Sequence, residues 1–127
     1  MSIHESGQMY LETIYILSQT KSYVRAIDVG EHLGYSKPSV SRAMSILKKN
    51  GYVLVDSDGA IALTESGMEI AQTMYTRHTV LSEMLIRLGV DEKTATEDAC
   101  RIEHVISAAS FSAIQQHVKQ SLGKIDD

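Results

Sequence analysis

A β-hairpin signal interrupts a sequence that otherwise favours helices. Two short β-prone runs, residues 52–55 and 60–63, flank Asp56-Ser57-Asp58-Gly59, and an Asp-Gly step between such runs is typical of a hairpin. The 127-residue chain contains one proline, one phenylalanine and no tryptophan, a composition that favours long helices over a β-sandwich. We therefore expect a mainly α-helical fold with one small hairpin, in a chain long enough to bury a core without disulfides.

Helical patterns precede the hairpin. Residues 5–20 and 26–33 are expected to be helical, and a third helix starts at Ser36, whose hydroxyl can cap free backbone N–H groups. Pro38 fits the first turn of that helix, and the Asn-Gly step at residues 50–51 is a typical stop signal. Helix, short helix, turn, helix and hairpin is the element order of a winged helix-turn-helix.

Three further helices are expected after the hairpin. Thr64 can cap a long fourth helix that reaches about residue 88. Asp91 can cap a fifth helix through about residue 106, and a sixth covers residues 107–122. Some apolar positions of the last two helices are expected to stay partly exposed in a monomer, which favours dimerisation; they are Ile106, Phe111, Ile114 and Val118.

The charge distribution differs between the two halves of the chain. The net charge is −4, but residues 1–64 are balanced and the whole excess of acidic residues falls in residues 65–127. Residues 36–49 contain four basic side chains and no acidic one. This local basic segment is compatible with nucleic-acid binding by a protein that is acidic overall.

The cellular compartment follows from what the sequence lacks. A single cysteine, Cys100, excludes an intramolecular disulfide and fits a reducing cytosol. No apolar run approaches the ~20 residues that a membrane-spanning helix needs, and residues 1–5 lack the charged and apolar regions of a signal peptide. We therefore expect a cytoplasmic protein.

The third helix carries the candidate DNA-reading surface. Its small hydroxyl side chains let a helix approach the major groove closely, and Arg42 can reach a guanine edge or a phosphate. The candidate DNA-binding residues are Ser36, Lys37, Pro38, Ser39, Ser41, Arg42, Lys48 and Lys49. The alternative is a helical bundle with a solvated basic face. The agreement of topology, cap, glycine breaks and hairpin favours DNA binding, with the hairpin as a wing over the DNA backbone.

Potential metal ligands occur together near residue 100. Cys100, Glu103 and His104 stand at positions i, i+3 and i+4 of the expected fifth helix, which places them on one helical face. A thiolate, a carboxylate and an imidazole are ligands for a transition-metal dication. The alternative is that the cysteine only packs and that Glu103 and His104 form an ordinary surface pair.

Three more residues strengthen the metal hypothesis. His78 shares an apolar stripe of the fourth helix with Met74 and Leu81, where a histidine more often only finds a hydrogen-bond partner. Met9 and Glu12 share one side of the first helix. Met9 alone would be ordinary core, but a carboxylate in an otherwise apolar stretch is harder to explain by packing.

Five motifs carry a resemblance to a known family. They are Met9-Tyr10-Leu11-Glu12-Thr13-Ile14-Tyr15, Ser39-Val40-Ser41, Leu63-Thr64-Glu65-Ser66-Gly67, Arg77-His78 and, most specifically, Ala99-Cys100-Arg101-Ile102-Glu103-His104-Val105. With these motifs the chain resembles the DtxR/MntR family of metal-dependent transcriptional repressors over nearly its whole length. The resemblance implies a winged helix-turn-helix DNA-binding domain at residues 1–66 and a metal-binding and dimerisation domain at residues 67–127. It also implies homodimers that bind palindromic operator DNA when loaded with metal.

The resemblance also implies a ligand set. The main ligands, as in the iron-responsive branch of the family, are Met9, Cys100, Glu103 and His104. Glu12 matches a ligand of the manganese branch, and His78 matches a ligand position in both branches. The iron branch has a Glu and a second His at an ancillary site where this chain has Ser82 and Thr96, so a second site of that kind is not implied.

Iron(II) is the expected effector, with manganese(II) as the alternative and Co²⁺, Ni²⁺ or Zn²⁺ as substitutes in vitro. The soft donors of Met9 and Cys100 suit iron better than manganese. Two other functions are weighed against the metal-dependent repressor. One is a winged-helix regulator that needs no metal; the other is a metallohydrolase, which is disfavoured because the sequence has no nucleophile motif and no Gly-rich phosphate loop. We therefore expect no enzymatic activity.

Overall fold

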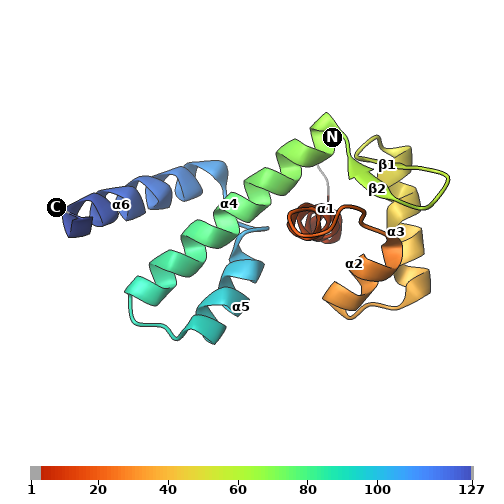
Figure 1. The fold of residues 1–127 in the computed structure, drawn as a ribbon. Helices are drawn as coiled ribbons and strands as arrows, with labels where there is room; N and C mark the ends of the chain where they lie inside the picture. The colour runs from red at the N-terminus through yellow and green to blue at the C-terminus, as the bar shows by residue number, and fades with distance from the viewer. Residues whose placement is uncertain (1–3, 127) are drawn as a thin grey trace. The chain divides into compact units, whose positions relative to one another are not determined.

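The computed structural model describes the backbone of residues 4–126 and the side chains of residues 4–120. Within this part the chain forms six helices and one two-stranded hairpin (Figure 1). The elements are α1 (Glu5–Ser18), α2 (Ala26–Leu33), α3 (Lys37–Lys49), β1 (Val53–Val55), β2 (Ile61–Leu63), α4 (Glu65–Arg87), α5 (Glu92–Ile102) and α6 (Ala108–Asp126). The expected mainly helical fold with a small hairpin is confirmed. No helix of the described residues combines the length and the apolar character that crossing a membrane requires.

The chain divides into two compact units, Met1–Met74 and Tyr75–Asp127. The first unit contains α1, α2, α3, the hairpin and the start of α4, which is the order of a winged helix-turn-helix. The second unit contains the rest of α4 with α5 and α6.

The expected local signals shape the first unit. The Ser36 hydroxyl accepts a hydrogen bond from the main-chain N–H of Ser39 at 3.4 Å and so caps α3. The helix ends at Asn50, and Gly51 follows with a φ of 80°, a left-handed conformation that glycine adopts at little steric cost. In the hairpin, the carboxylate of Asp56 accepts hydrogen bonds of 2.9 Å from the main-chain N–H groups of Asp58 and Ala60.

An apolar core holds the first unit together. Leu11 and Ile14 of α1, Val29 of α2, Val40 of α3 and Val53 of β1 are all buried in one cluster. The hairpin pairs antiparallel, with residue 53 opposite residue 63 and residue 55 opposite residue 61. The wing is therefore fixed to the helices that carry the DNA-reading candidates.

The start of α4 packs against the backbone after α3. A Cβ on Gly67 would lie 2.1 Å from the carbonyl oxygen of Tyr52, so only glycine fits there. Thr64 caps the helix as expected: its hydroxyl accepts from the N–H of Gly67 at 3.2 Å and donates to the carbonyl of Gly51 at 2.7 Å. These contacts fix where the wing ends and α4 begins.

The second unit has a smaller apolar core. Leu81 of α4, Ala99 of α5 and Phe111 of α6 form its buried centre. The expectation that Phe111 and Val118 stay exposed in a monomer is wrong, because they are only 8% and 5% exposed within a single chain. Ile106 and Ile114 are partly buried against the same cluster. The apolar stripe of α6 thus serves the core of its own chain.

The fifth helix is shorter than expected, because it ends at Ile102 rather than near residue 106. It begins as expected, with the carboxylate of Asp91 accepting from the N–H of Thr94 at 3.0 Å. After α5 ends, the hydroxyl of Ser107 accepts a hydrogen bond from the N–H of Ser110 at 3.1 Å and so caps the start of α6. A capping residue has extended rather than helical backbone, so the chain leaves the helical path before Ser107.

Candidate metal centre and nucleic-acid interface

Glu103 is the most unusual residue of the second unit, because its carboxyl group is fully buried. It is 0% exposed and forms the C-terminal cap of α5, where its N–H donates to the carbonyl of Ala99 at 2.9 Å. A buried carboxylate is strongly unfavourable unless it is paired or binds a cation. The groups around the Glu103 carboxylate therefore indicate whether it is paired or suited to bind a cation.

Each carboxylate oxygen of Glu103 faces a different imidazole. Nδ1 of His78, on α4, donates to Oε2 across 2.9 Å, and Nε2 of His104 lies 3.3 Å from Oε1. The side chain of His78 is 24% exposed and that of His104 is fully buried. Two imidazoles around one buried carboxylate form the kind of nitrogen and oxygen donor set that binds transition-metal dications.

The structure corrects the expected placement of these residues on a single helix. Cys100 lies half-buried on α5, one helical turn before Glu103. His104 lies in the turn after α5, so the predicted i, i+3, i+4 arrangement on one helical face is wrong for His104. The three residues still lie within one short segment, which the early end of α5 leaves next to α4.

Arg77 is a residue of this region whose role the sequence analysis missed. Its Nη1 donates to the main-chain carbonyls of Glu103 and Ile106, each at 3.1 Å. Its guanidinium carbon lies 5.6 Å from the centre of the Phe111 ring, within the range of a cation–π contact. The signal that could have found it is its position directly before His78.

Ser82 and Thr96 lie together at a surface groove of the second unit. The lining of this groove also includes His78, Glu83, Arg87 and Glu92. Glu83 is already paired with Arg87 at 3.3 Å. Ser82 and Thr96 offer neither a carboxylate nor an imidazole, so an ancillary site of the iron-branch type is still not implied.

The candidate ligands of α1 belong to the first unit. Glu12 is only 7% exposed, and Met9 is half-buried. The hydroxyl of Tyr35, in the turn before α3, donates to Sδ of Met9 at 3.5 Å. The ring of Tyr35 also meets that of Tyr10 edge-on at 5.9 Å. Burial raises the pKa of Tyr10, and the neighbouring Tyr35 adds to that rise.

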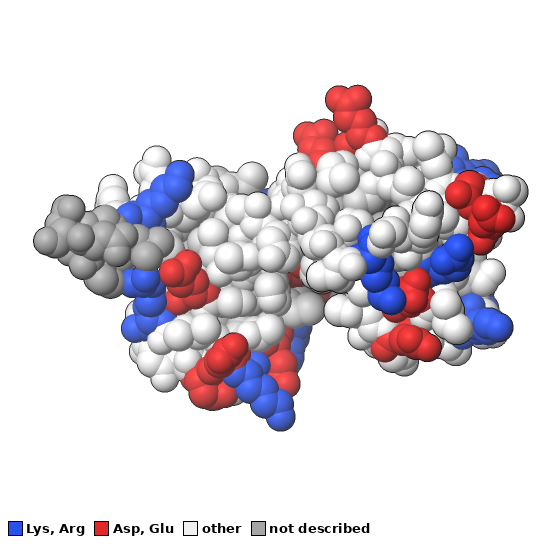
Figure 2. Space-filling view, in the orientation of Figure 1, with Lys and Arg blue, Asp and Glu red and all other residues white. Residues whose placement is uncertain are grey.

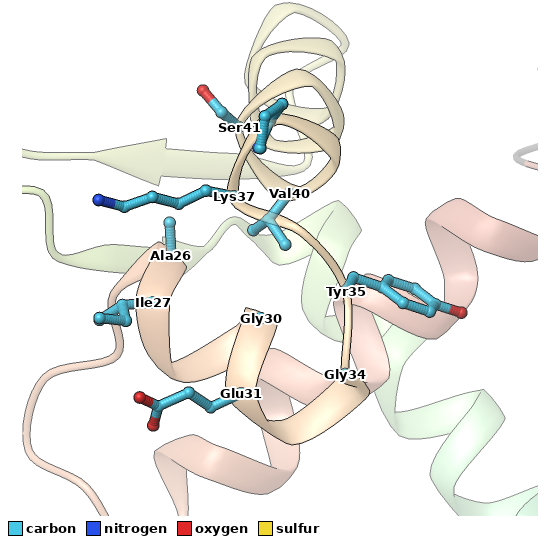
Figure 3. Close-up of a pocket in the computed structure, with 10 residues that line it drawn as sticks. Ala26, Ile27, Gly30, Glu31, Gly34, Tyr35, Lys37, Val40 and Ser41 are labelled. Carbon is cyan, nitrogen blue, oxygen red and sulfur yellow. The ribbon is translucent and has the colours of Figure 1, made fainter.

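The DNA-reading candidates of α3 all lie on the surface. This holds for Ser36, Lys37, Pro38, Ser39, Ser41, Arg42, Lys48 and Lys49. A groove of about 520 Å³ separates α2 from α3, with Ala26 and Ile27 on one side and Lys37 and Ser41 on the other (Figure 3). Val40 of the same helix is buried. The helix therefore presents a polar and basic face while its apolar face holds the core.

The electrostatic surface is mixed. In the view of Figure 2, basic and acidic side chains are interspersed on both units. The wing itself carries Asp56 and Asp58 at its tip. On the face that Figure 2 shows, the basic side chains do not form one continuous positive patch.

The fold and the buried donor group define a class of protein: a winged helix-turn-helix with metal-ligand chemistry in its helical second unit. Comparison with known families agrees. Residues 2–61 match the family described as "Iron dependent repressor, N-terminal DNA binding domain". Residues 64–121 match "Iron dependent repressor, metal binding and dimerisation domain".

Individual relatives support the same family. The HTH-type transcriptional regulator MntR of Lysinibacillus sphaericus is 32% identical over 114 residues, which cover 90% of this chain and 82% of the relative. MntR of Bacillus subtilis is 33% identical over 109 residues, which cover 86% and 77%. A solved structure described as a manganese-dependent transcriptional repressor complex with manganese has a TM-score of 0.81 and 28% identity. The match covers 89% of this chain and 52% of that one, so this chain spans about half its length.

The chain belongs to the DtxR/MntR family of metal-dependent transcriptional repressors. It combines the family's DNA-binding domain with its metal-binding and dimerisation domain. Members of this family are repressors of transcription and not enzymes.

Proposed function

We propose that this chain binds a dication through Met9, Glu12, His78, Cys100, Glu103 and His104. The single observation that carries the proposal is the fully buried carboxylate of Glu103 between two imidazole nitrogens, at 2.9 Å and 3.3 Å. Glu12 on α1 supports the proposal because it is a second buried carboxylate, and apolar packing does not explain why a carboxylate is buried. A bound dication would supply the positive charge that offsets repulsion between the two carboxylates and a Cys100 thiolate.

We propose residues 1–66 as the DNA-binding domain and residues 67–127 as the metal-binding and dimerisation domain of a homodimer. Ser36, Lys37, Pro38, Ser39, Ser41, Arg42, Lys48 and Lys49, all exposed, would contact a palindromic operator. Arg42 would read a base edge or hold a phosphate, and Lys48 and Lys49 would hold phosphates. We propose that the protein acts in the cytoplasm, where it would bind operator DNA.

The regulatory logic follows from where the proposed ligands lie in the chain. Met9 and Glu12 belong to the element that precedes the helix-turn-helix, whereas the other ligands belong to the dimerisation domain. Ligands shared by both domains would restrict the arrangement of the two recognition helices of the dimer. A metal that binds the DNA-competent arrangement more tightly increases its population. A high concentration of the metal would then cause operator binding and repression of transcription. Genes for metal uptake would be suitable targets of such a repressor.

Iron(II) is the proposed effector, with manganese(II) as the alternative. The thioether of Met9 and the thiol of Cys100 are softer donors than the oxygen ligands that manganese prefers. One similar solved structure is described as a manganese-dependent transcriptional repressor in complex with manganese. Glu12 is a hard donor that keeps manganese possible here, and supply in the cell also sets metal choice.

A double substitution tests the proposed basis of metal choice. Met9→Asp with Cys100→Glu replaces both soft donors by carboxylates. We expect its manganese affinity to rise relative to its iron affinity, measured by anaerobic calorimetry with each metal for parent and variant. Fluorescence anisotropy on a duplex selected in vitro with metal present extends the test to DNA binding. An unchanged manganese-to-iron ratio contradicts the assignment of iron through Met9 and Cys100.

A further inference from the structure

Two consecutive residues of α4 hold two different parts of Glu103. His78 donates to the Glu103 carboxylate at 2.9 Å, and Arg77 donates to the main-chain carbonyl of the same residue at 3.1 Å. The first contact engages the proposed metal-binding group directly. The second fixes the backbone from which that group projects.

The Arg77 contacts close the turn that follows α5. The turn at residues 103–106 lies outside the helix, and Nη1 of Arg77 donates to two of its main-chain carbonyls, those of Glu103 and Ile106. The guanidinium also lies over the ring of Phe111 on α6, 5.6 Å from its centre. One half-buried side chain thus connects α4, the turn and α6 around His104.

We propose that Arg77 is a positioning residue for the metal centre: it sets the backbone of residues 103–106 so that the side chains of Glu103 and His104 meet at a dication. This inference rests on the proposed function, because it takes Glu103 and His104 as ligands. Residues that hold ligands in place typically change metal affinity by 10- to 100-fold when they are replaced.

The sign of the expected effect separates positioning from electrostatics. The Arg77 guanidinium is positive, like the ion, so its charge alone disfavours a dication nearby. If charge were the main effect, Arg77→Met would bind metal more tightly than the parent. If positioning is the main effect, Arg77→Met binds metal more weakly in spite of the lost repulsion.

Lysine provides the second variant. Arg77→Lys keeps the charge, but a single ammonium lacks the planar fork and the stacking on Phe111. We expect both variants to bind Co²⁺ about tenfold more weakly than the parent. The matched control is Arg87→Met on the same helix, which removes an arginine paired with Glu83 and is expected to leave Co²⁺ affinity unchanged.

The experiment is an anaerobic calorimetric titration of the full chain with Co²⁺, together with the visible absorption spectrum of the bound cobalt. Circular dichroism first establishes a temperature at which each variant is folded, and Arg77→Lys carries the test where Arg77→Met does not fold. A weakened affinity with an altered cobalt spectrum supports positioning, because a loss of stability alone moves neither in a folded protein. Parent-like or tighter binding by the folded Arg77 variants overturns the inference. Absence of Co²⁺ binding by the parent instead contradicts the proposed function itself.

Discussion

The two units of the chain bury different chemistry. The first unit closes around a continuous apolar cluster that takes side chains from α1, α2, α3 and the hairpin. The second has a small apolar centre of Leu81, Ala99 and Phe111, and beside it a buried carboxylate, two imidazoles and an arginine that holds main-chain carbonyls. The interior of the first unit is therefore mainly apolar, with Glu12 as its buried carboxylate, whereas the second unit buries several polar groups beside a small apolar centre.

Buried apolar and buried charged groups contribute differently to the stability of the two units. An apolar core gains stability from each buried side chain, and the buried residues of α3, which carries the DNA-binding candidates, are all apolar: Val40, Met44 and Leu47. A buried charged cluster contributes little to stability and often less than an apolar replacement would. The proposed metal site would explain why the second unit buries such a cluster.

Truncation of each core should produce the largest effect. Leu11→Ala in the first unit and Leu81→Ala in the second remove fully buried side chains, and such changes cost about 2–5 kcal/mol. We expect the larger loss for Leu11→Ala, because its apolar surroundings are more extensive and leave the larger unfilled cavity. Urea denaturation of both variants measures the difference. A larger loss for Leu81→Ala would show that the second unit relies on its apolar centre as much as the first.

Removing Arg42 should have an intermediate effect that appears only in DNA binding. Arg42→Ala is expected to weaken binding to a selected duplex by about 1–3 kcal/mol if the side chain makes a bidentate base contact. The matched control is Arg101→Ala, an exposed arginine of α5 in the other unit. Metal affinity should be unchanged in both variants. Equal DNA affinity of the Arg42 variant, the control and the parent is incompatible with α3 as the recognition helix.

The smallest effect concerns a half-buried carboxylate in the first unit, that of Asp28, for comparison with the fully buried Glu103. The main-chain hydrogen bond from Arg25 holds the pKa of Asp28 below its usual range, and Lys21 at 3.4 Å adds to this. A lowered pKa contributes stability above the unfolded value, and this contribution is lost as the pH falls through the folded value. Asp28→Ala should therefore cost only about 0.5 kcal/mol at neutral pH.

The pH dependence of that variant provides the check. The difference in unfolding free energy between parent and Asp28→Ala should shrink as the pH falls below about 4, where aspartate is ordinarily protonated. Thermal unfolding from pH 7 to pH 3 measures it. A difference that stays constant over this range would mean that the carboxylate charge of Asp28 contributes nothing.

Local signals predicted most of the fold because they act within a few residues. The Ser36 cap, the Asn50 stop and the Asp56 turn each depend on a side chain next to the backbone group that it satisfies. The candidate metal ligands were also suggested by the sequence, since Glu12 lies in an otherwise apolar stretch and Glu103 stands close to Cys100 and His104.

Tertiary contacts decided what the sequence could not predict. At the end of α5, the carbonyl of Glu103 accepts a hydrogen bond from Arg77, which lies 26 residues earlier in the chain. The burial of Phe111 and Val118 was mispredicted because an apolar helix stripe does not reveal whether it faces its own core or another chain. The pairing of His78 with Glu103 likewise joins different elements, so spacing along one helix could not show it.

The central claim is that the buried carboxylate of Glu103 contributes to metal binding and not to the stability of the metal-free fold. The direct measurement is the unfolding free energy of the parent and of Glu103→Gln, which has nearly the same shape, with and without Co²⁺. We predict that the parent gains about 2.7 kcal/mol at a Co²⁺ concentration 100 times its dissociation constant. At that same concentration Glu103→Gln should gain far less, while without metal it should be about as stable as the parent. An equal gain from Co²⁺ in both proteins would contradict the claim.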